Sequence, residues 1–122
     1  MPLEDMKEES MDSILTSIKK LIGITEEDTT FDIDIIIAIN SAFTVLNQLG
    51  VGPEEGFTIS DDMTNWDEFL PEGKQLELVK TYIYLKVKLI FDPPSSSTVL
   101  EAFQRQVNEC EWRLNVAVDP AK

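Results

Sequence analysis

Apolar residues recur every three or four positions in four stretches of this chain, which is the spacing of amphipathic helices. The first stretch lies between Asp12 and Gly23. Asp12 or Ser10 can cap the free backbone amides at its start, and Gly23 can adopt the left-handed conformation that often follows a helix. The apolar positions that predict this helix are Ile14, Leu15, Ile18, Leu21 and Ile22.

The second stretch, residues 33–50, predicts the most buried helix, because its apolar side chains cover more than one helical face. Thr29, Thr30 or Asp32 can cap its start. The β-branched run at 35–37 would also suit a strand, but the apolar pattern persists for about four turns and ends at a glycine, which favours a helix. The apolar positions are Ile33, Ile36, Ile37, Ile39, Ala42, Phe43, Leu46 and Leu49.

The third stretch is ambiguous over residues 82–91, which alternate between apolar and polar as a strand would. A longer apolar stripe at helical spacing has no breaker, so we predict a helix over residues 74–91. Pro93 and Pro94 cannot continue a helix and therefore end it near residue 91. The stripe consists of Leu76, Val79, Ile83, Val87 and Ile90.

The fourth stretch combines a narrow seam with an unusual outer surface. Thr98 and Glu101 have the spacing of a capping box at its start. Both arginines of the chain, Arg105 and Arg113, lie off the seam together with Trp112. Because Arg and Trp are enriched at protein interfaces, we expect these three residues to contact a partner. The seam has heptad-like spacing and consists of Leu100, Phe103, Val107, Cys110 and Leu114.

A long loop rich in glycine and proline, residues 51–71, separates the second and third helices. We expect a short extended piece at 57–59 and one helical turn that begins with a capping box at residues 64–67. Two large aromatic side chains, Trp66 and Phe69, lie in this turn. They either pin the loop to the core or anchor a neighbouring subunit.

Together these elements predict an all-α fold: a small bundle of about four helices with a long central loop and an extended C-terminal tail. We expect one helical domain over residues 11–115, a flexible acidic extension at 1–10 and a C-terminal tail at 116–122. Met11 is a candidate natural start.

The charge of the chain is strongly uneven. The formal net charge is −13, and no Lys or Arg occurs between Lys20 and Lys74, where 12 of the 23 acidic residues lie. Such a surface repels phosphate, which argues against sequence-specific nucleic-acid binding. It serves solubility alone, binds a basic protein, or forms a surface that nucleic acid passes without adhering. No apolar run approaches the roughly 20 residues that span a bilayer, so we expect a soluble intracellular protein without a membrane partner.

The chain offers little catalytic chemistry. It contains no histidine, and its single cysteine, Cys110, lies on the apolar seam and is expected to be a small buried side chain. The acid pairs at 54–55 and 61–62 lie in a polar loop and are expected to be solvated. No calcium-binding loop or phosphate loop fits the sequence. We therefore expect no catalytic residue, cofactor or metal, and no enzyme activity.

With these residues in view, the sequence resembles the head-tail connector proteins of long-tailed phages and prophages. The resemblance runs over roughly residues 11–120 and rests on MDSILTSIKKLIGI, on DIDIIIAINSAFTVLNQLGVGPEEGF followed by TNWDEF, and on VKTYIYLKVKLIFDPPSSSTVLEAFQRQVNECEWRLNV. It implies a structural virion protein, assembled in the cytoplasm of the bacterial host, that forms a ring beneath the portal. The ring would be dodecameric if it follows the portal, extend the DNA channel and join the head to tail-completion or stopper proteins.

A rival hypothesis follows from the charge alone. An acidic protein can imitate DNA and occupy the basic cleft of a nucleic-acid enzyme, and the base-free stretch from Leu21 to Gly73 suits that role. The two functions differ in assembly. A connector forms large symmetric assemblies or binds the portal, whereas a DNA mimic binds a basic enzyme in a salt-sensitive complex.

Overall fold

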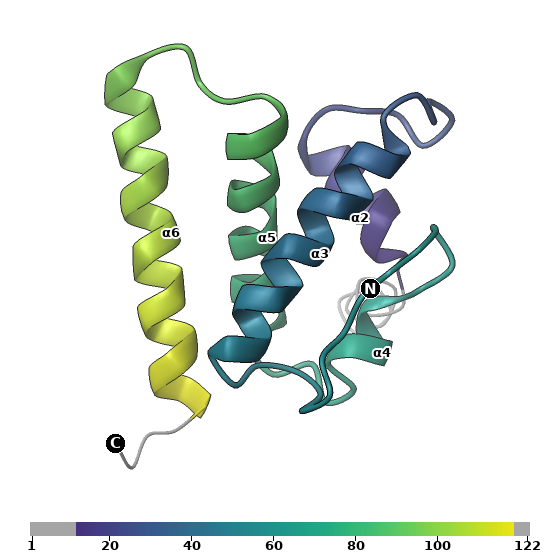
Figure 1. The fold of residues 1–122 in the computed structure, drawn as a ribbon, viewed down its shortest axis with the longest axis vertical. Helices are drawn as coiled ribbons and strands as arrows, with labels where there is room; N and C mark the ends of the chain where they lie inside the picture. Colours follow the sequence, from purple (N-terminus) through teal and green to yellow (C-terminus); the bar gives the residue numbers. More distant parts are fainter. Residues whose placement is uncertain (1–11, 119–122) are drawn as a thin grey trace, which may run out of the picture.

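The structure is a computed structural model that describes residues 12–118, which form five helices and no strand (Figure 1). The predicted all-α fold is confirmed, and four of the helices have eight or more residues. The prediction for residues 1–10 lies outside the described residues. The helices are α2 (Ile14–Leu21), α3 (Asp32–Gln48), α4 (Trp66–Phe69), α5 (Leu76–Phe91) and α6 (Ser97–Val118).

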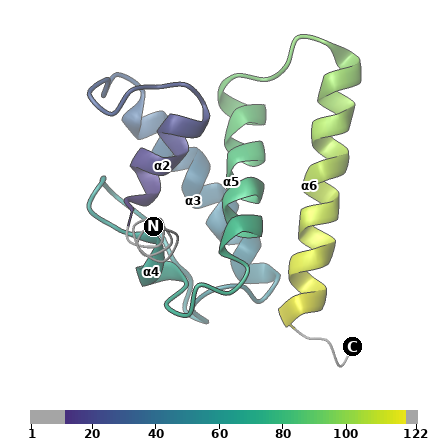
Figure 2. The same cartoon turned by 180° about the vertical axis from the view of Figure 1, so that it is seen from behind.

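Helix α5 is the centre of the packing. Both α3 and α6 pack along it, and α2 packs against α3 and α5. Figures 1 and 2 show α6 alone at one edge of the molecule, with α2, α4 and their loops at the opposite edge. The core lies between these elements and is built on large side chains that water does not reach, among them Phe43, Trp66, Phe69 and Tyr82.

Helix α2 begins at Ile14, one residue later than a cap at Asp12 would place it. Ser13 is the cap, because its Oγ accepts a hydrogen bond from the Thr16 N–H at 3.2 Å. The prediction of Asp12 was therefore wrong, and Ser10 lies outside the described residues. Gly23 follows the helix with φ of 85°, as predicted. The left-handed conformation lets the chain turn away from α2 without a side-chain clash.

The predicted caps of α3 are also wrong. The helix begins after Phe31, and no side chain caps it. The Thr30 N–H instead donates to Asp28 Oδ1 at 3.1 Å, in a turn that precedes the helix. Asp32 lies within the first turn, where its Oδ1 is 2.8 Å from Lys19 Nζ. An ion pair with α2 therefore holds the start of α3 in place of a cap.

The apolar residues of α3 are not all buried. Ile33 and Ile37 keep 74% and 60% of their surface exposed, although the sequence pattern placed both in the core. They lie one turn apart on the side of α3 that faces away from the core residues. The inner face suffices for packing against α2 and α5 and consists of Ile35, Ala38, Ile39, Ala42, Phe43 and Leu46.

The helical prediction for the ambiguous third stretch is confirmed, and α5 ends at Phe91 before the two prolines. The start of α6 differs from the prediction. Ser96 Oγ accepts a 3.4 Å hydrogen bond from the Val99 N–H, whereas Thr98 already lies inside the helix. The capping box of Thr98 with Glu101 is therefore absent. Because Ser96 directly precedes Ser97, the first residue of the helix, it takes the position that a cap requires.

The extended tail predicted from residue 116 is wrong for its first three residues, since α6 continues to Val118. The end of α6 packs on the end of α3. Asn115 Nδ2 donates to the Leu49 carbonyl at 3.4 Å, and Val118 lies so close to Gly50 that a Cβ there would be 2.9 Å from its Cγ1. These contacts keep the last turn helical. The rest of the predicted tail, residues 119–122, lies outside the described residues.

Candidate subunit interface

The outer surface of α6 carries the three residues that the sequence singled out on this helix. Arg105, Trp112 and Arg113 are exposed, and Trp112 keeps 67% of its surface accessible to water. At 3.6 residues per turn, Arg105, Trp112 and Val116 lie nearly in line, on the side opposite the buried seam. We call this surface the outer face of α6 and define it by five exposed residues: Arg105, Glu109, Trp112, Arg113 and Val116. Its exposed aromatic side chain is the kind that binds a partner.

The outer face of α6 carries two arginines and one acid, Glu109. Arg113 Nη2 lies 3.7 Å from Glu109 Oε1, one turn away, and both side chains are more than half exposed. An exposed pair at this spacing contributes little to stability. The guanidinium of Arg113 therefore remains available to a partner.

The inner side of α6 is held to α5 by a narrow seam. The buried residues are Val107, Cys110 and Leu114. The Tyr82 hydroxyl donates to Glu111 Oε2 at 2.9 Å beside this seam. Burial, followed by the hydrogen bond to Glu111 and its negative charge, raises the pKa of Tyr82 well above its usual range. Burial likewise raises the pKa of the Cys110 thiol, which makes it a poor nucleophile.

Trp66 and Phe69 lie inside the subunit. Both are buried, so of the two roles that the sequence left open, the structure shows them pinning the loop to the core. Trp66 Nε1 donates to Ser17 Oγ at 3.0 Å, and that hydroxyl donates to the Ser13 carbonyl at 2.8 Å. The Phe69 ring packs against Phe43, with the ring centroids 4.6 Å apart. Neither side chain is accessible to a neighbour in this conformation.

The turn that carries these aromatics is capped differently from the prediction. Asn65 N–H donates to Glu68 Oε2 at 2.8 Å, so the capping-box spacing is Asn65 with Glu68, not Thr64 with Asp67. The turn is tied to α2 by two backbone hydrogen bonds, from Ile14 N–H to the Thr64 carbonyl at 2.9 Å and from Trp66 N–H to the Asp12 carbonyl at 3.2 Å. The loop is therefore fixed to the start of α2.

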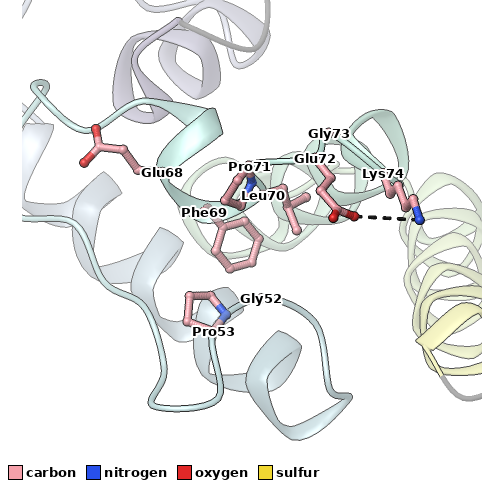
Figure 3. Close-up of a pocket in the computed structure, with 9 residues that line it drawn as sticks. All are labelled: Gly52, Pro53, Glu68, Phe69, Leu70, Pro71, Glu72, Gly73 and Lys74. Atoms are coloured by element: carbon pink, nitrogen blue, oxygen red, sulfur yellow. Dashed lines mark ion pairs between the residues drawn. The ribbon is translucent and has the colours of Figure 1, made fainter.

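An open cavity of about 480 Å³ lies between two segments of the long loop, residues 52–53 and 68–74 (Figure 3). The Phe69 ring points toward Gly52 across it. Its charged groups include Glu72 and Lys74, which are 3.7 Å apart and largely exposed. The cavity has no buried acid or base that could act on a substrate, so its chemistry is that of a loop surface.

The second exposed apolar surface lies at the start of α3 and was missed by the sequence analysis. Its apolar part consists of Ile33 and Ile37, and four exposed acids lie near it: Glu26, Glu27, Asp28 and Asp34. We call these six residues together the α3 start. The signal was present in the sequence, because the isoleucines between residues 33 and 39 outnumber the positions on one helical face. Periodicity cannot tell how many faces of a helix have neighbours.

Residues 12–118 contain no group of three or more side chains that could hold a metal ion. The acid pairs at 54–55 and 61–62 are exposed, as expected. Among the same residues, no helix is both long and apolar enough to cross a bilayer.

Comparison with known proteins adds one finding. A family model described as "Phage connector protein" matches residues 14–121, which include every described helix from α2 to α6. The resemblance inferred from the sequence is confirmed by this match. No curated protein and no solved structure matches the chain.

Proposed function

Because this chain belongs to the phage connector protein family, we propose that copies of it form a ring beneath the portal of a phage or prophage, extend the DNA channel and join the head to the tail. Membership of the family itself makes the chain a virion component with a structural, non-enzymatic head-tail connector role. The match over residues 14–121 is the observation that carries this function. It covers the whole helical domain instead of a short motif.

The proposed partners follow from that position in the virion. They are other copies of the chain, the portal protein, and a tail-completion or stopper protein. A ring that follows portal symmetry has twelve copies, and assembly takes place in the cytoplasm of the host. The exposed outer face of α6 and the α3 start support a protein that works through contacts with other chains.

DNA is proposed to pass through the ring without sequence-specific binding. The net charge of −13 and the long base-free segment support this, because a negative wall repels the phosphate backbone. Adhesion would slow the passage of DNA, whereas repulsion keeps it away from the wall. The acidic DNA mimic explains the same charge, but the family match favours the connector.

Native mass by light scattering tests the proposal, first with the purified chain across a wide concentration range and then with the portal protein of the same phage or prophage. The expected result is a discrete species of many copies, alone or on the portal. A chain that stays monomeric and does not bind the portal would contradict the connector. A one-to-one, salt-sensitive complex with a basic nucleic-acid enzyme would support the DNA mimic instead.

A further inference from the structure

We propose that the outer face of α6 on one subunit binds the α3 start of a second copy, so that subunits join head to tail. The inference rests on the proposed function, because it assigns the contact from which the ring is built. Four properties of the two surfaces support this contact: their exposed apolar side chains, the spacing of those side chains, their charge, and their placement in the subunit.

Each surface exposes a pair of large apolar side chains. On α3 the pair is Ile33 and Ile37, and on α6 it is Trp112 and Val116. Val116 keeps 43% of its surface exposed. Burying such side chains yields roughly 25 cal/mol for each Å² removed from water. A contact that covers both pairs gains the free energy of burying all four side chains. Trp112 lies at its centre, and tryptophan is enriched at binding hot spots.

The spacing of the two pairs matches. Both Ile33–Ile37 and Trp112–Val116 are four residues apart on a helix. With a rise of about 1.5 Å per residue, each pair spans roughly 6 Å along its axis. Two helices that pack side by side can therefore bring both pairs into contact at once. Beyond Asp34, α3 has no charged side chain to interrupt the contact.

The charges of the two surfaces are complementary. The α3 start carries Asp34 beside the isoleucines and three exposed acids at residues 26–28, in a segment that has no Lys or Arg. On α6, Arg113 adjoins Trp112, and Arg105 lies two turns earlier on the same face. Copies with a net charge of −13 repel one another, and a contact that places acids against arginines offsets part of that repulsion.

The two surfaces lie at different edges of the subunit. In Figures 1 and 2, α6 forms one edge, while the loop before α3 and the beginning of α3 lie toward the other, with α5 between them. A contact between unlike surfaces leaves the second surface of each copy free for a further copy. Such a heterologous contact repeats from subunit to subunit and produces a ring when its rotation closes.

Disulfide trapping tests this contact directly. The double variant Ile33→Cys/Trp112→Cys is oxidised at millimolar concentration, with each single variant and the unmodified chain as controls. We expect the double variant to form a ladder of covalent dimers, trimers and larger species. The single variants should give no more dimer than the unmodified chain, whose Cys110 is buried. Absence of a ladder would overturn the contact, and so would strong dimers of either single variant, which indicate a two-fold contact.

Charge reversal gives an independent measurement. Arg113→Glu should weaken self-association at least about tenfold, because it places a like charge against the acids of the next copy. Lys74→Glu is the matched control, since it changes the net charge equally but lies in the loop before α5, where its side chain is 84% exposed. We expect less than about a threefold effect from it. Equal effects of the two variants would overturn the contact.

Failure of this inference can be told from failure of the proposed function. If the chain forms a ring or binds the portal while the disulfide ladder is absent, the connector function stands and the assigned contact is wrong. If the chain neither assembles nor binds the portal, the function itself fails.

Discussion

Asn40 and Ile59 exchange two hydrogen bonds between α3 and the long loop. Asn40 Nδ2 donates to the Ile59 carbonyl at 2.9 Å, and the Ile59 N–H donates to Asn40 Oδ1 at 2.8 Å. The Asn40 amide thus satisfies both backbone polar groups of Ile59, as a neighbouring β-strand would. Ile59 is itself buried, so these groups have no access to water. This pair fixes the loop at Ile59 against α3.

Replacing Asn40 should therefore be costly. Asn40→Ala leaves two buried backbone groups of Ile59 without partners, and we expect a loss of about 2–4 kcal/mol in the free energy of unfolding. Urea denaturation followed by circular dichroism measures it. Asn108→Ala, at an exposed position of α6, is the control and should stay within about 0.5 kcal/mol of the parent. Equal midpoints for the two variants would contradict this role of Asn40.

Gly52 and Gly56 offer a matched pair, since both have positive φ, 87° and 94°. A Cβ at Gly52 would overlap the Phe69 ring, whereas nothing lies within 4 Å of one at Gly56. Gly56→Ala should cost only the backbone strain, about 1–2 kcal/mol. Gly52→Ala should cost about 1–3 kcal/mol more, because the ring must move. Thermal or urea unfolding of the two variants gives the difference, and a value near zero would show that Phe69 relaxes freely.

Lys19 is a buried cation and should contribute strongly to stability. Its side chain is 3% exposed, it pairs with Asp32, and its Nζ donates to the Glu26 carbonyl at 3.1 Å. Asp32 Oδ1 lies 2.8 Å from Lys19 Nζ but has no hydrogen-bond partner among residues 12–118, so the two groups interact as an ion pair. Lys19→Met leaves that acid unpaired, and we expect a loss on the order of 3 kcal/mol in the free energy of unfolding.

The neighbouring Lys20 supplies the control for this measurement. Its side chain is exposed, so Lys20→Met should change the free energy of unfolding by no more than about 0.5 kcal/mol. Both variants lose one positive charge, and a difference between them therefore reports burial and pairing. Similar values for the two lysines would show that the pair with Asp32 adds little.

The two tryptophans should separate stability from assembly. Trp66→Ala empties a buried site and leaves its hydrogen-bond partner behind, so we expect a loss of about 3–5 kcal/mol. Trp112→Ala removes an exposed side chain and should change stability by no more than about 0.5 kcal/mol. Self-association should nevertheless weaken in Trp112→Ala, as measured by sedimentation. A destabilised Trp112→Ala with unchanged association would assign Trp112 to the fold.

Stability should fall in alkaline solution because of Tyr82. Burial and the contact with Glu111 raise the pKa of Tyr82, so the folded protein keeps the phenol proton at pH values where the unfolded chain loses it. The contribution is complete below about pH 10 and is lost as the pH rises above it. We expect Tyr82→Phe to show a smaller fall in the free energy of unfolding between pH 8 and about pH 11. Parallel curves for parent and variant would contradict the assignment.

Much of the fold was predictable because helical periodicity is a local signal. The spacing of apolar residues located α2, α3, α5 and α6, and Pro93 located the end of α5. The caps were less predictable, because several hydroxyl and acid side chains compete at each start. Ser13 and Ser96 take that role because each directly precedes the first residue of its helix.

The surface exposure of the candidate interface residues could be predicted only in part. The apolar seam identified the buried face of α6. Three residues off that face were therefore correctly expected at the surface: Arg105, Trp112 and Arg113. Trp66 and Trp112 have the same chemistry but opposite exposure, which depends on contacts between distant segments. The pairing of Asn40 with Ile59 and the exposure of Ile33 are of the same kind. Tertiary packing decides them, and no local pattern records it.

The narrow buried seam of α6, at one edge of the molecule, has a consequence for the order of events in assembly. Helix α6 packs along α5 about as extensively as α3 does, but it contributes only three of the buried side chains. We therefore expect α6 to open at a lower free energy than unfolding of the whole subunit. The helices α2 to α5 then act as one cooperative unit and α6 as a second, separable one. We expect the amide hydrogens of α6 to exchange first in the free subunit and to become protected when the proposed contact with a second copy forms, so that α6 is the last element to be fixed.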